Sequence, residues 1–216
     1  YRDPDPGGET DRPQGLLREV FESTKLLFTD ASMIALGSIA FVHSYSFFSY
    51  VGLLPTWLLN FQFISGDSVG LYNSILFWAL IAGGLLVPSL SDFVSDRELI
   101  LIPITIVMGL AIIATGSSVS RLTLIPALVV TGLSAGGLIP LVFTLINERM
   151  DVGPSRQSAE AGFLLSASQP GVVVGPSIGG FLFEQYGILF SAVTVGGPIF
   201  LVGLYLGVRH VTRTAR

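Results

Sequence analysis

The chain has 216 residues, half of them hydrophobic and only 12% charged, which is typical of a membrane protein rather than a soluble domain. Its mean hydropathy is +0.71, and its net charge of −4 describes solvent-facing edges, because most of the charges lie in the tails and the connecting loops. It has no cysteine and only two histidines, which excludes disulfides and thiolate-bound metals, and no cofactor is expected.

The first 15 residues, YRDPDPGGETDRPQG, are rich in Pro, Gly and acidic side chains and do not supply an apolar face to bury. Residues 16–28 place four apolar side chains among charged ones at roughly helical spacing: Leu16, Val20, Phe21 and Leu27. They form either a short helix on the membrane surface or a solvated extension of the next helix. Residues 1–30 are expected to be a cytoplasmic linker. Because the chain starts with Tyr and shows no signal peptide, it is expected to be part of a longer protein.

Six apolar stretches follow, each long enough to cross a hydrocarbon core of about 30 Å as a helix. Their cores lie near residues 32–60, 68–91, 99–118, 121–147, 159–185 and 187–208. The connections between them carry the Gly, Ser, Asp or Asn residues that end helices. The sequence therefore predicts an all-α polytopic membrane protein, with a six-helix bundle over residues 31–208 and a cytoplasmic tail over residues 209–216.

Lysine and arginine gather on one side of these crossings. An even number of crossings puts both termini on the same side, and that side carries ten of the eleven basic residues. Only Arg121 lies on the other side. Because cytoplasmic loops retain Lys and Arg, we expect both termini in the cytoplasm and the protein in the plasma membrane.

One titratable side chain besides tyrosine lies in the middle of a predicted crossing, His43. Intramembrane ionisable residues are costly to bury and are functional by default. On a helical wheel it falls within about 60° of three others, which together form a polar and aromatic stripe: Ser46, Tyr50 and Trp57. His43 either contacts a substrate in a cavity wall or hydrogen-bonds a neighbouring helix. The same two interpretations apply to the other uncharged polar candidates: Asn73, Ser166 and Gln169.

The fifth stretch contains an uncharged run of small residues, GFLLSASQPGVVVGPSIGG, over residues 162–180. Gly171, Gly175 and Gly179 lie within about 80° of one another on a wheel, which predicts a seam for close helix packing. The opposite side, beside Ser166 and Gln169, holds the remaining two glycines, Gly162 and Gly180. Pro176 removes a backbone hydrogen bond and favours a bend for gating.

Six helices behind a charged leader, with a long basic loop between the fourth and fifth, resemble the C-terminal half of a major facilitator superfamily transporter. The glycine spacing of residues 162–180, with its Gly-Pro pair, is similar to the signature that drug/proton antiporters of that superfamily carry in their fifth helix. Here the run would lie in the eleventh helix, the counterpart in the second half. An N-terminal half is the alternative. Against it, VVTGLSAGG in the fourth stretch lacks the family's mid-membrane Arg, and the leader resembles the family's central loop.

The connection PSLSDFVSDRE is similar to a degraded copy of the superfamily's loop signature. Asp92 matches, Pro88 and Ser95 replace two glycines, and Arg97 is the one basic residue kept of two. In the family this Asp helps to lock the cytoplasmic gate while the transporter faces outward, so the resemblance implies the same role here.

A carboxylate at the membrane edge can also cap a helix N-terminus and pair with an arginine. We expect Asp92 to do so at residues 158–160, with Arg149 or Arg156 as its partner. The alternative is that Asp92 ends its helix in solvent.

The resemblance implies a secondary active transporter that moves a small solute by alternating access, with proton-coupled efflux as its antiporter form. The lack of fixed charge at membrane depth indicates a neutral or amphipathic solute rather than a phosphate or a dicarboxylate. The expected partners are the N-terminal six-helix half, the lipid bilayer and the small-molecule substrate, without nucleic acid. An uptake permease for a small organic solute and a non-catalytic membrane scaffold are the alternatives.

A further alternative is an intramembrane serine protease, because Gly132, Ser134 and Gly136 fit the G-x-S-x-G nucleophile pattern. That pattern needs a strand before the serine, whereas this one lies inside an apolar helix. Close helix packing is the better explanation for the small residues, and no enzyme is expected.

Overall fold

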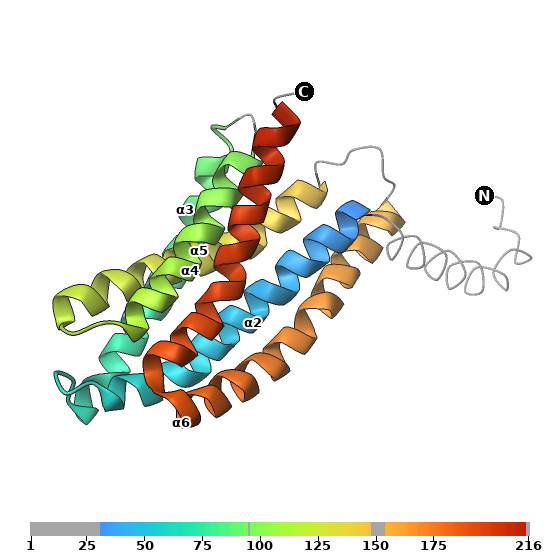
Figure 1. The fold of residues 1–216 in the computed structure, drawn as a ribbon. Coiled ribbons are helices and arrows are strands. Elements are labelled where there is room, and N and C mark those ends of the chain that lie inside the picture. The colour runs from blue at the N-terminus through green and yellow to red at the C-terminus, as the bar shows by residue number, and fades with distance from the viewer. Residues whose placement is uncertain (1–30, 95, 148–153, 215–216) are drawn as a thin grey trace, which may run out of the picture.

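The computed structural model describes residues 31–94, 96–147 and 154–214. The expected leader over residues 1–30 lies outside them, as do Arg149 and the side chain of Arg156. The described chain is helical and confirms the predicted all-α class (Figure 1). Its elements are α2 (Ala31–Asn60), the short 3-10 helix η1 (Gly66–Ser68), α3 (Val69–Ser91), α4 (Glu98–Gly116), α5 (Arg121–Asn147) and α6 (Pro154–Thr214).

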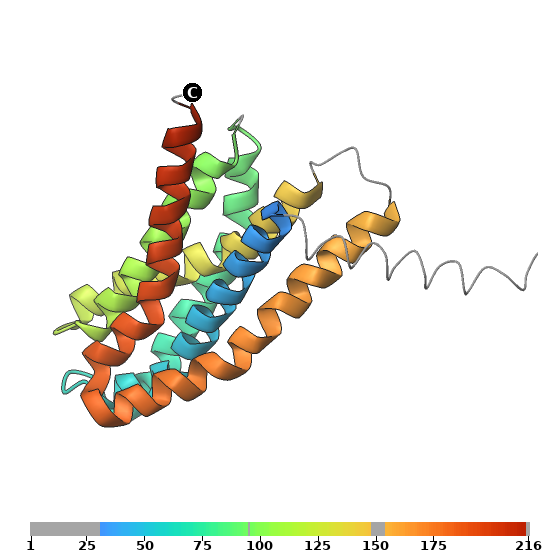
Figure 2. The ribbon, with the colours of Figure 1, turned by 45° about the vertical axis from the view of Figure 1, so that its right-hand side comes forward.

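The fifth and sixth apolar stretches form one element, α6, which turns back on itself at Gly187. This residue has φ 80° and ψ −175°, a backbone conformation that residues with a side chain rarely adopt. The Ser191 hydroxyl donates a hydrogen bond of 2.8 Å to the Gly179 carbonyl across the turn. Figures 1 and 2 show the two arms, orange and red, running in opposite directions. The predicted connection between these stretches is thus a single non-helical glycine, and α6 remains helical past residue 208 as far as Thr214.

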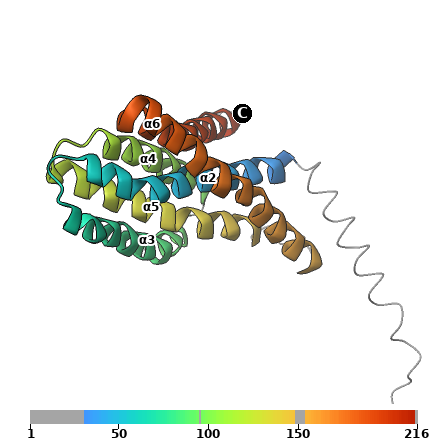
Figure 3. The same ribbon diagram turned by 90° about the horizontal axis from the view of Figure 1, so that it is seen from below.

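The helices pack in a fixed set of pairs. Helix α2 packs mainly on α6, α3 on α5, and α4 on both α5 and α6. Seen from below, α3 and α6 lie on opposite sides, with α2, α4 and α5 between them (Figure 3). Helices far apart in the sequence, such as α2 and α6, are therefore direct neighbours.

Glycines allow the closest of these approaches. A Cβ at Gly109 in α4 would lie 2.6 Å from the carbonyl oxygen of Gly196 in α6, and the reverse distance is also 2.6 Å. In the α3–α5 pair, a Cβ at Gly132 would lie 2.5 Å from the carbonyl oxygen of Leu76. Small residues of this kind drive helix association in a bilayer. Packing on α3 therefore accounts for the glycine of the G-x-S-x-G pattern.

The outer surface of the bundle is strongly apolar. Trp78 and Leu85 on α3 are 72% and 69% exposed, and Val208 on α6 is 65% exposed. A soluble protein rarely presents large apolar side chains in such number. Five helices of the described chain are long and apolar enough to cross a membrane, and the last of them holds both later stretches. The chain is a multi-pass membrane protein.

Candidate functional site

A cavity of about 540 Å³ lies between α2, α3, α5 and the first arm of α6. None of its described lining residues is Asp, Glu, Lys or Arg. Its polar lining side chains come from α2 and α6, and they are His43, Ser44, Ser168 and Gln169. Its aromatic lining comes from α2 and α5, and consists of Phe47, Phe48 and Phe143. Such a site offers hydrogen bonds and apolar contact without fixed charge.

His43 is the most constrained polar group of this cavity. Its side chain is buried, and its ring stacks on Phe47 with a centroid distance of 5.9 Å and an interplanar angle of 10°. Its Nδ1 has no hydrogen-bond partner among the described residues. A buried polar atom left without a partner costs about 1–3 kcal/mol. Nδ1 itself has almost no exposed surface, so this nitrogen is not presented to the cavity.

Two of the predicted polar candidates, His43 and Gln169, are brought to the same cavity. Gln169 is exposed and faces it from α6. Asn73 on α3 is half-buried and Ser166 on α6 is exposed, and neither lines the cavity. Both remain candidates from the sequence alone.

The rest of the predicted α2 stripe lies inside the bundle. Ser46, Tyr50 and Trp57 have no exposed surface and do not line the cavity. The Tyr50 hydroxyl is 3.0 Å from Thr115 Oγ1 of α4, and its ring contacts Trp57 edge-on at 5.8 Å. This side of α2 therefore joins it to the bundle interior.

Sequence reasoning missed Ser44 and Ser168 as cavity residues. Ser44 lies one helical turn from Ala40 and from Phe48, and all three line the cavity. This alternation of small, polar and aromatic side chains at a spacing of four residues was the signal that could have found Ser44. Ser168 likewise lies one helical turn from Leu164 and from Val172, which also line the cavity.

The three glycines of the predicted seam all lie at the contact between α6 and α2. A Cβ at Gly171 would lie 2.5 Å from the carbonyl oxygen of Phe41, and one at Gly179 would lie 2.7 Å from Leu53 Cδ1. Gly175 sits between them, equally close to α2. The backbone of α6 thus approaches α2 along the two turns that follow the cavity-lining residue Gln169.

The other residues of the glycine run have more room. A Cβ at Gly162 would meet nothing within 4 Å, and one at Gly180 would meet only Leu53, at 3.8 Å. Pro176 lies beside Gly52 of α2, where a Cβ would be 3.7 Å from the proline ring. Helix α6 continues through Pro176 without a non-helical residue before Gly187.

At the end of the bundle where α3 meets α4, Asp92 is exposed and forms an ion pair of 3.1 Å with Arg97. Arg97 also donates a hydrogen bond of 3.0 Å to Ser91 Oγ, which holds the loop against the end of α3. The expected partners Arg149 and Arg156 have side chains outside the described residues. The gate role of Asp92 stays a prediction.

A second polar contact, which sequence reasoning missed, joins α4 to α6. His210 Nδ1 lies 3.1 Å from Glu98 Oε2 and 3.8 Å from Asp96 Oδ2. Glu98 stands at the first turn of α4, Asp96 just before it, and His210 in the last turns of α6. Hydrogen-bonding side chains at helix ends on the same side of the membrane were the available signal. In the described part of the chain, no group of three or more His, Asp or Glu side chains is placed to hold a metal ion.

Known proteins that resemble this chain identify its family and its fold. The family model described as Major Facilitator Superfamily matches residues 36–216. The POT family transporter PepTSo has a similar structure, with a TM-score of 0.66 and 13% identity over 82% of this chain and 36% of its own. An auto-inhibited POT family peptide transporter gives 0.66 and 14% over 83% of this chain and 37% of its own. The chain therefore spans little more than a third of these transporters, and the likeness shows a shared fold.

Proposed function

Because this chain belongs to the Major Facilitator Superfamily, we propose that it forms the C-terminal six-helix half of a secondary active transporter. The transporter moves a small neutral or amphipathic solute by alternating access of two bundles around a central site. The observation that carries the proposal is the cavity of about 540 Å³, a size suited to a small organic molecule, with no fixed charge in its described lining. A phosphate or a dicarboxylate would need Arg or Lys at this depth.

The lining residues divide the work of binding. The His43 imidazole and the Gln169 amide offer hydrogen bonds from two different helices, α2 and α6. Phe47, Phe48 and Phe143 offer ring faces and edges to an apolar or aromatic solute. Because the two hydrogen-bonding groups come from different helices, the pair of hydrogen bonds orients the solute, while the aromatic side chains of α2 and α5 supply apolar contact.

The N-terminal six-helix half is the proposed partner, and it supplies the opposite wall of the cavity and any proton-coupling carboxylate. The much greater length of the solved transporters of this fold supports this partner. The proposed location is the plasma membrane with both termini in the cytoplasm. The gathering of ten of eleven basic residues on one side supports that orientation.

The direction of transport in this proposal is efflux coupled to protons. Its support is the likeness of residues 162–180 to the antiporter signature. An uptake permease shares every structural feature described above and differs only in the sign of the flux. A non-catalytic membrane scaffold differs by showing no flux at all.

The test is flux through the complete reading frame that contains this chain, purified into proteoliposomes. The solutes are an uncharged aromatic amphiphile and the phosphate ester of the same skeleton, each with and without a proton gradient. We expect saturable transport of the neutral solute, driven by the gradient, and little transport of the ester. Preference for the ester would refute the proposed substrate class, and flux insensitive to the gradient would refute proton coupling. No flux from folded protein for any solute of the panel would favour the scaffold.

The reading frame upstream of Tyr1 is an independent check. Six further membrane spans are expected there. An initiator methionine close to Tyr1 would contradict a two-half transporter in one chain.

A further inference from the structure

A second cavity, of about 250 Å³, lies where α2 and α4 begin and α6 ends. It shares no lining residue with the larger cavity. Membrane-spanning segments Met33–Asn60 and Glu98–Gly116 start beside it, and Ser158–Arg213 finishes beside it. The cavity therefore lies at the level where apolar membrane segments give way to water, which is the headgroup level of a bilayer.

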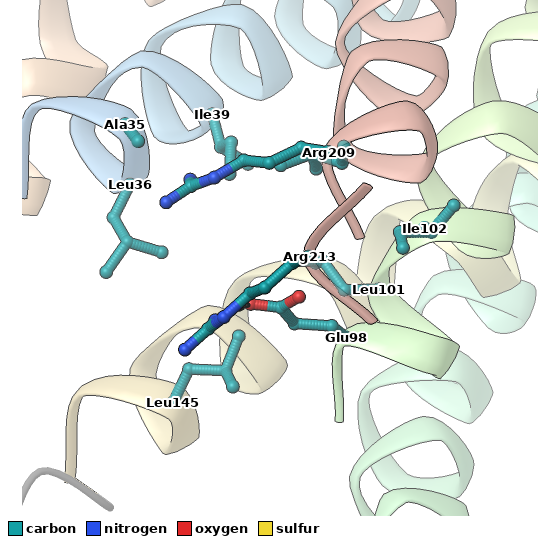
Figure 4. Close-up of a pocket in the computed structure, with 10 residues that line it drawn as sticks. Ala35, Leu36, Ile39, Glu98, Leu101, Ile102, Leu145, Arg209 and Arg213 are labelled. Carbon is teal, nitrogen blue, oxygen red and sulfur yellow. Dashed lines mark ion pairs between the residues drawn. The ribbon is translucent and has the colours of Figure 1, made fainter. Parts of the chain in front are cut away.

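The walls of this cavity combine an apolar floor with two guanidinium groups. Leu36, Ile39 and Leu101 form part of the floor, and each is buried. Arg209 and Arg213 are one turn apart on α6, and their guanidinium groups extend in the same direction across the cavity (Figure 4). Two adjacent guanidinium forks match the oxygens of a phosphate group, because each can donate two parallel hydrogen bonds.

The two acidic side chains near this cavity, Glu98 and Asp96, both lie beside His210. Glu98 lines the cavity too, but its Oε2 is 3.1 Å from His210 Nδ1, while its Oε1 is 3.9 Å from Arg213 Nη1. Asp96 also lies on the His210 side, at 3.8 Å. Arg209 forms no ion pair with any side chain of the described residues. Among the described residues, the Arg209 guanidinium therefore has no acidic partner, and that of Arg213 is only loosely paired.

We propose that this cavity binds the phosphate of an anionic phospholipid, with the start of an acyl chain lying on the Ile39 and Leu101 floor. Basic pockets between membrane helices bind anionic headgroups through the same charge attraction. A free phosphate would bind the two arginines but leave the apolar floor exposed to water. A phospholipid would bind the arginines through its phosphate and cover the floor with its acyl chain. The proposal concerns a site apart from the substrate cavity and does not depend on the transported solute.

The test is a titration of the purified full-length protein in detergent with phosphatidylglycerol or phosphatidylcholine, in which bound lipid is counted by native mass spectrometry. We expect tighter binding of phosphatidylglycerol. Each arginine near the surface contributes about fivefold to the affinity for an anionic lipid, so the Arg209→Gln/Arg213→Gln variant should lose roughly 25-fold. Arg121→Gln, which removes an arginine at the opposite end of the bundle, should change it less than about twofold.

Two further variants keep the test informative if the double variant folds poorly. Arg209→Lys keeps the charge and removes the planar fork, and a loss of a few fold is expected. Ala35→Phe fills the cavity while leaving both arginines in place. It should therefore weaken the binding of phosphatidylglycerol although no charge has been removed. Equal affinity for the two lipids, or an equal loss in Arg121→Gln, would overturn the proposal. Displacement of the lipid by equimolar inorganic phosphate would also overturn it, because the site would then take a free anion.

Discussion

Gly175 of α6 lies directly on the backbone of Tyr45 in α2, and a Cβ at position 175 would stand 2.5 Å from the Tyr45 carbonyl oxygen. No real Cβ tolerates that distance to a rigid backbone atom. The contact joins the two helices that carry the polar groups of the larger cavity, His43 and Gln169. The width of that cavity therefore depends on a position without a side chain.

Gly175→Ala should separate α2 from α6 and lower the free energy of unfolding by about 1–3 kcal/mol, the usual cost of overpacking. The measurement is thermal unfolding of the purified protein in detergent. Gly162→Ala is the matched control on the same helix, where a Cβ meets nothing within 4 Å, and no loss is expected. Equal stability of the two variants would contradict the seam.

His43→Leu removes both ring nitrogens and puts an apolar side chain of similar size in their place. If the imidazole bonds the solute, KM should rise about fivefold to 150-fold, which corresponds to the 1–3 kcal/mol of a buried polar contact. Ser46→Ala is the control, because Ser46 is buried on the same helix but does not line the cavity. An unchanged KM in His43→Leu would show that His43 has only a structural role in helix packing and does not contact the solute.

Gln169→Ala should change which solutes are transported while the protein still folds, because the amide faces the cavity from α6. The readout is the ratio of kcat/KM between two solutes that differ in one hydrogen-bonding group. Ser166→Ala, three residues earlier and away from the cavity, should leave that ratio unchanged. A shared effect of both variants would indicate a helix displacement instead of a direct contact.

Tyr50→Phe removes the hydroxyl that meets Thr115 of α4 at 3.0 Å. The free energy of unfolding should fall by about 0.6–1.7 kcal/mol, the range for hydrogen bonds between membrane helices. Tyr72→Phe is the control, because Tyr72 is also buried and its hydroxyl has no hydrogen bond with the described residues. KM should be unchanged in both variants, and a raised KM in Tyr50→Phe would place this hydroxyl at the substrate.

Asp92→Asn should shift the balance between inward-facing and outward-facing states if this carboxylate locks the gate. Since the chain has no cysteine, a single reporter cysteine placed in it gives a clean measure of accessibility to a thiol reagent. Arg97→Gln should shift accessibility in the same direction, because Arg97 is the described partner of Asp92. Asp67→Asn, at the other end of the bundle, should not. Unchanged transport and accessibility in Asp92→Asn would remove the gate hypothesis.

The helices themselves were predictable because their lengths are dictated by the bilayer. The stretch expected over 121–147 coincides with α5, and the one expected over 32–60 differs from α2 by a single residue. The turn at Gly187 was placed correctly, but the sequence predicted a short loop there. One glycine suffices because its backbone alone reverses the chain.

The candidate site was less predictable. A helical wheel correctly groups residues on one face, but it does not say which face meets a cavity. On α2 the predicted stripe turns out to face the bundle interior, and only His43 belongs to both surfaces. The rotation of α2 is set by its contact with α6, far away in the sequence.

The sequence by itself determined the membrane location, the number of crossings and the small-residue face of α6, because each follows from the local cost of exposing backbone and charge to hydrocarbon. Only the tertiary structure decided that α2 pairs with α6, that His43 and Gln169 share one cavity, and that Arg209 and Arg213 stand over an apolar floor. These depend on helix pairing and rotation. They are set by the packing of surfaces that lie far apart along the chain, and no local pattern encodes that packing.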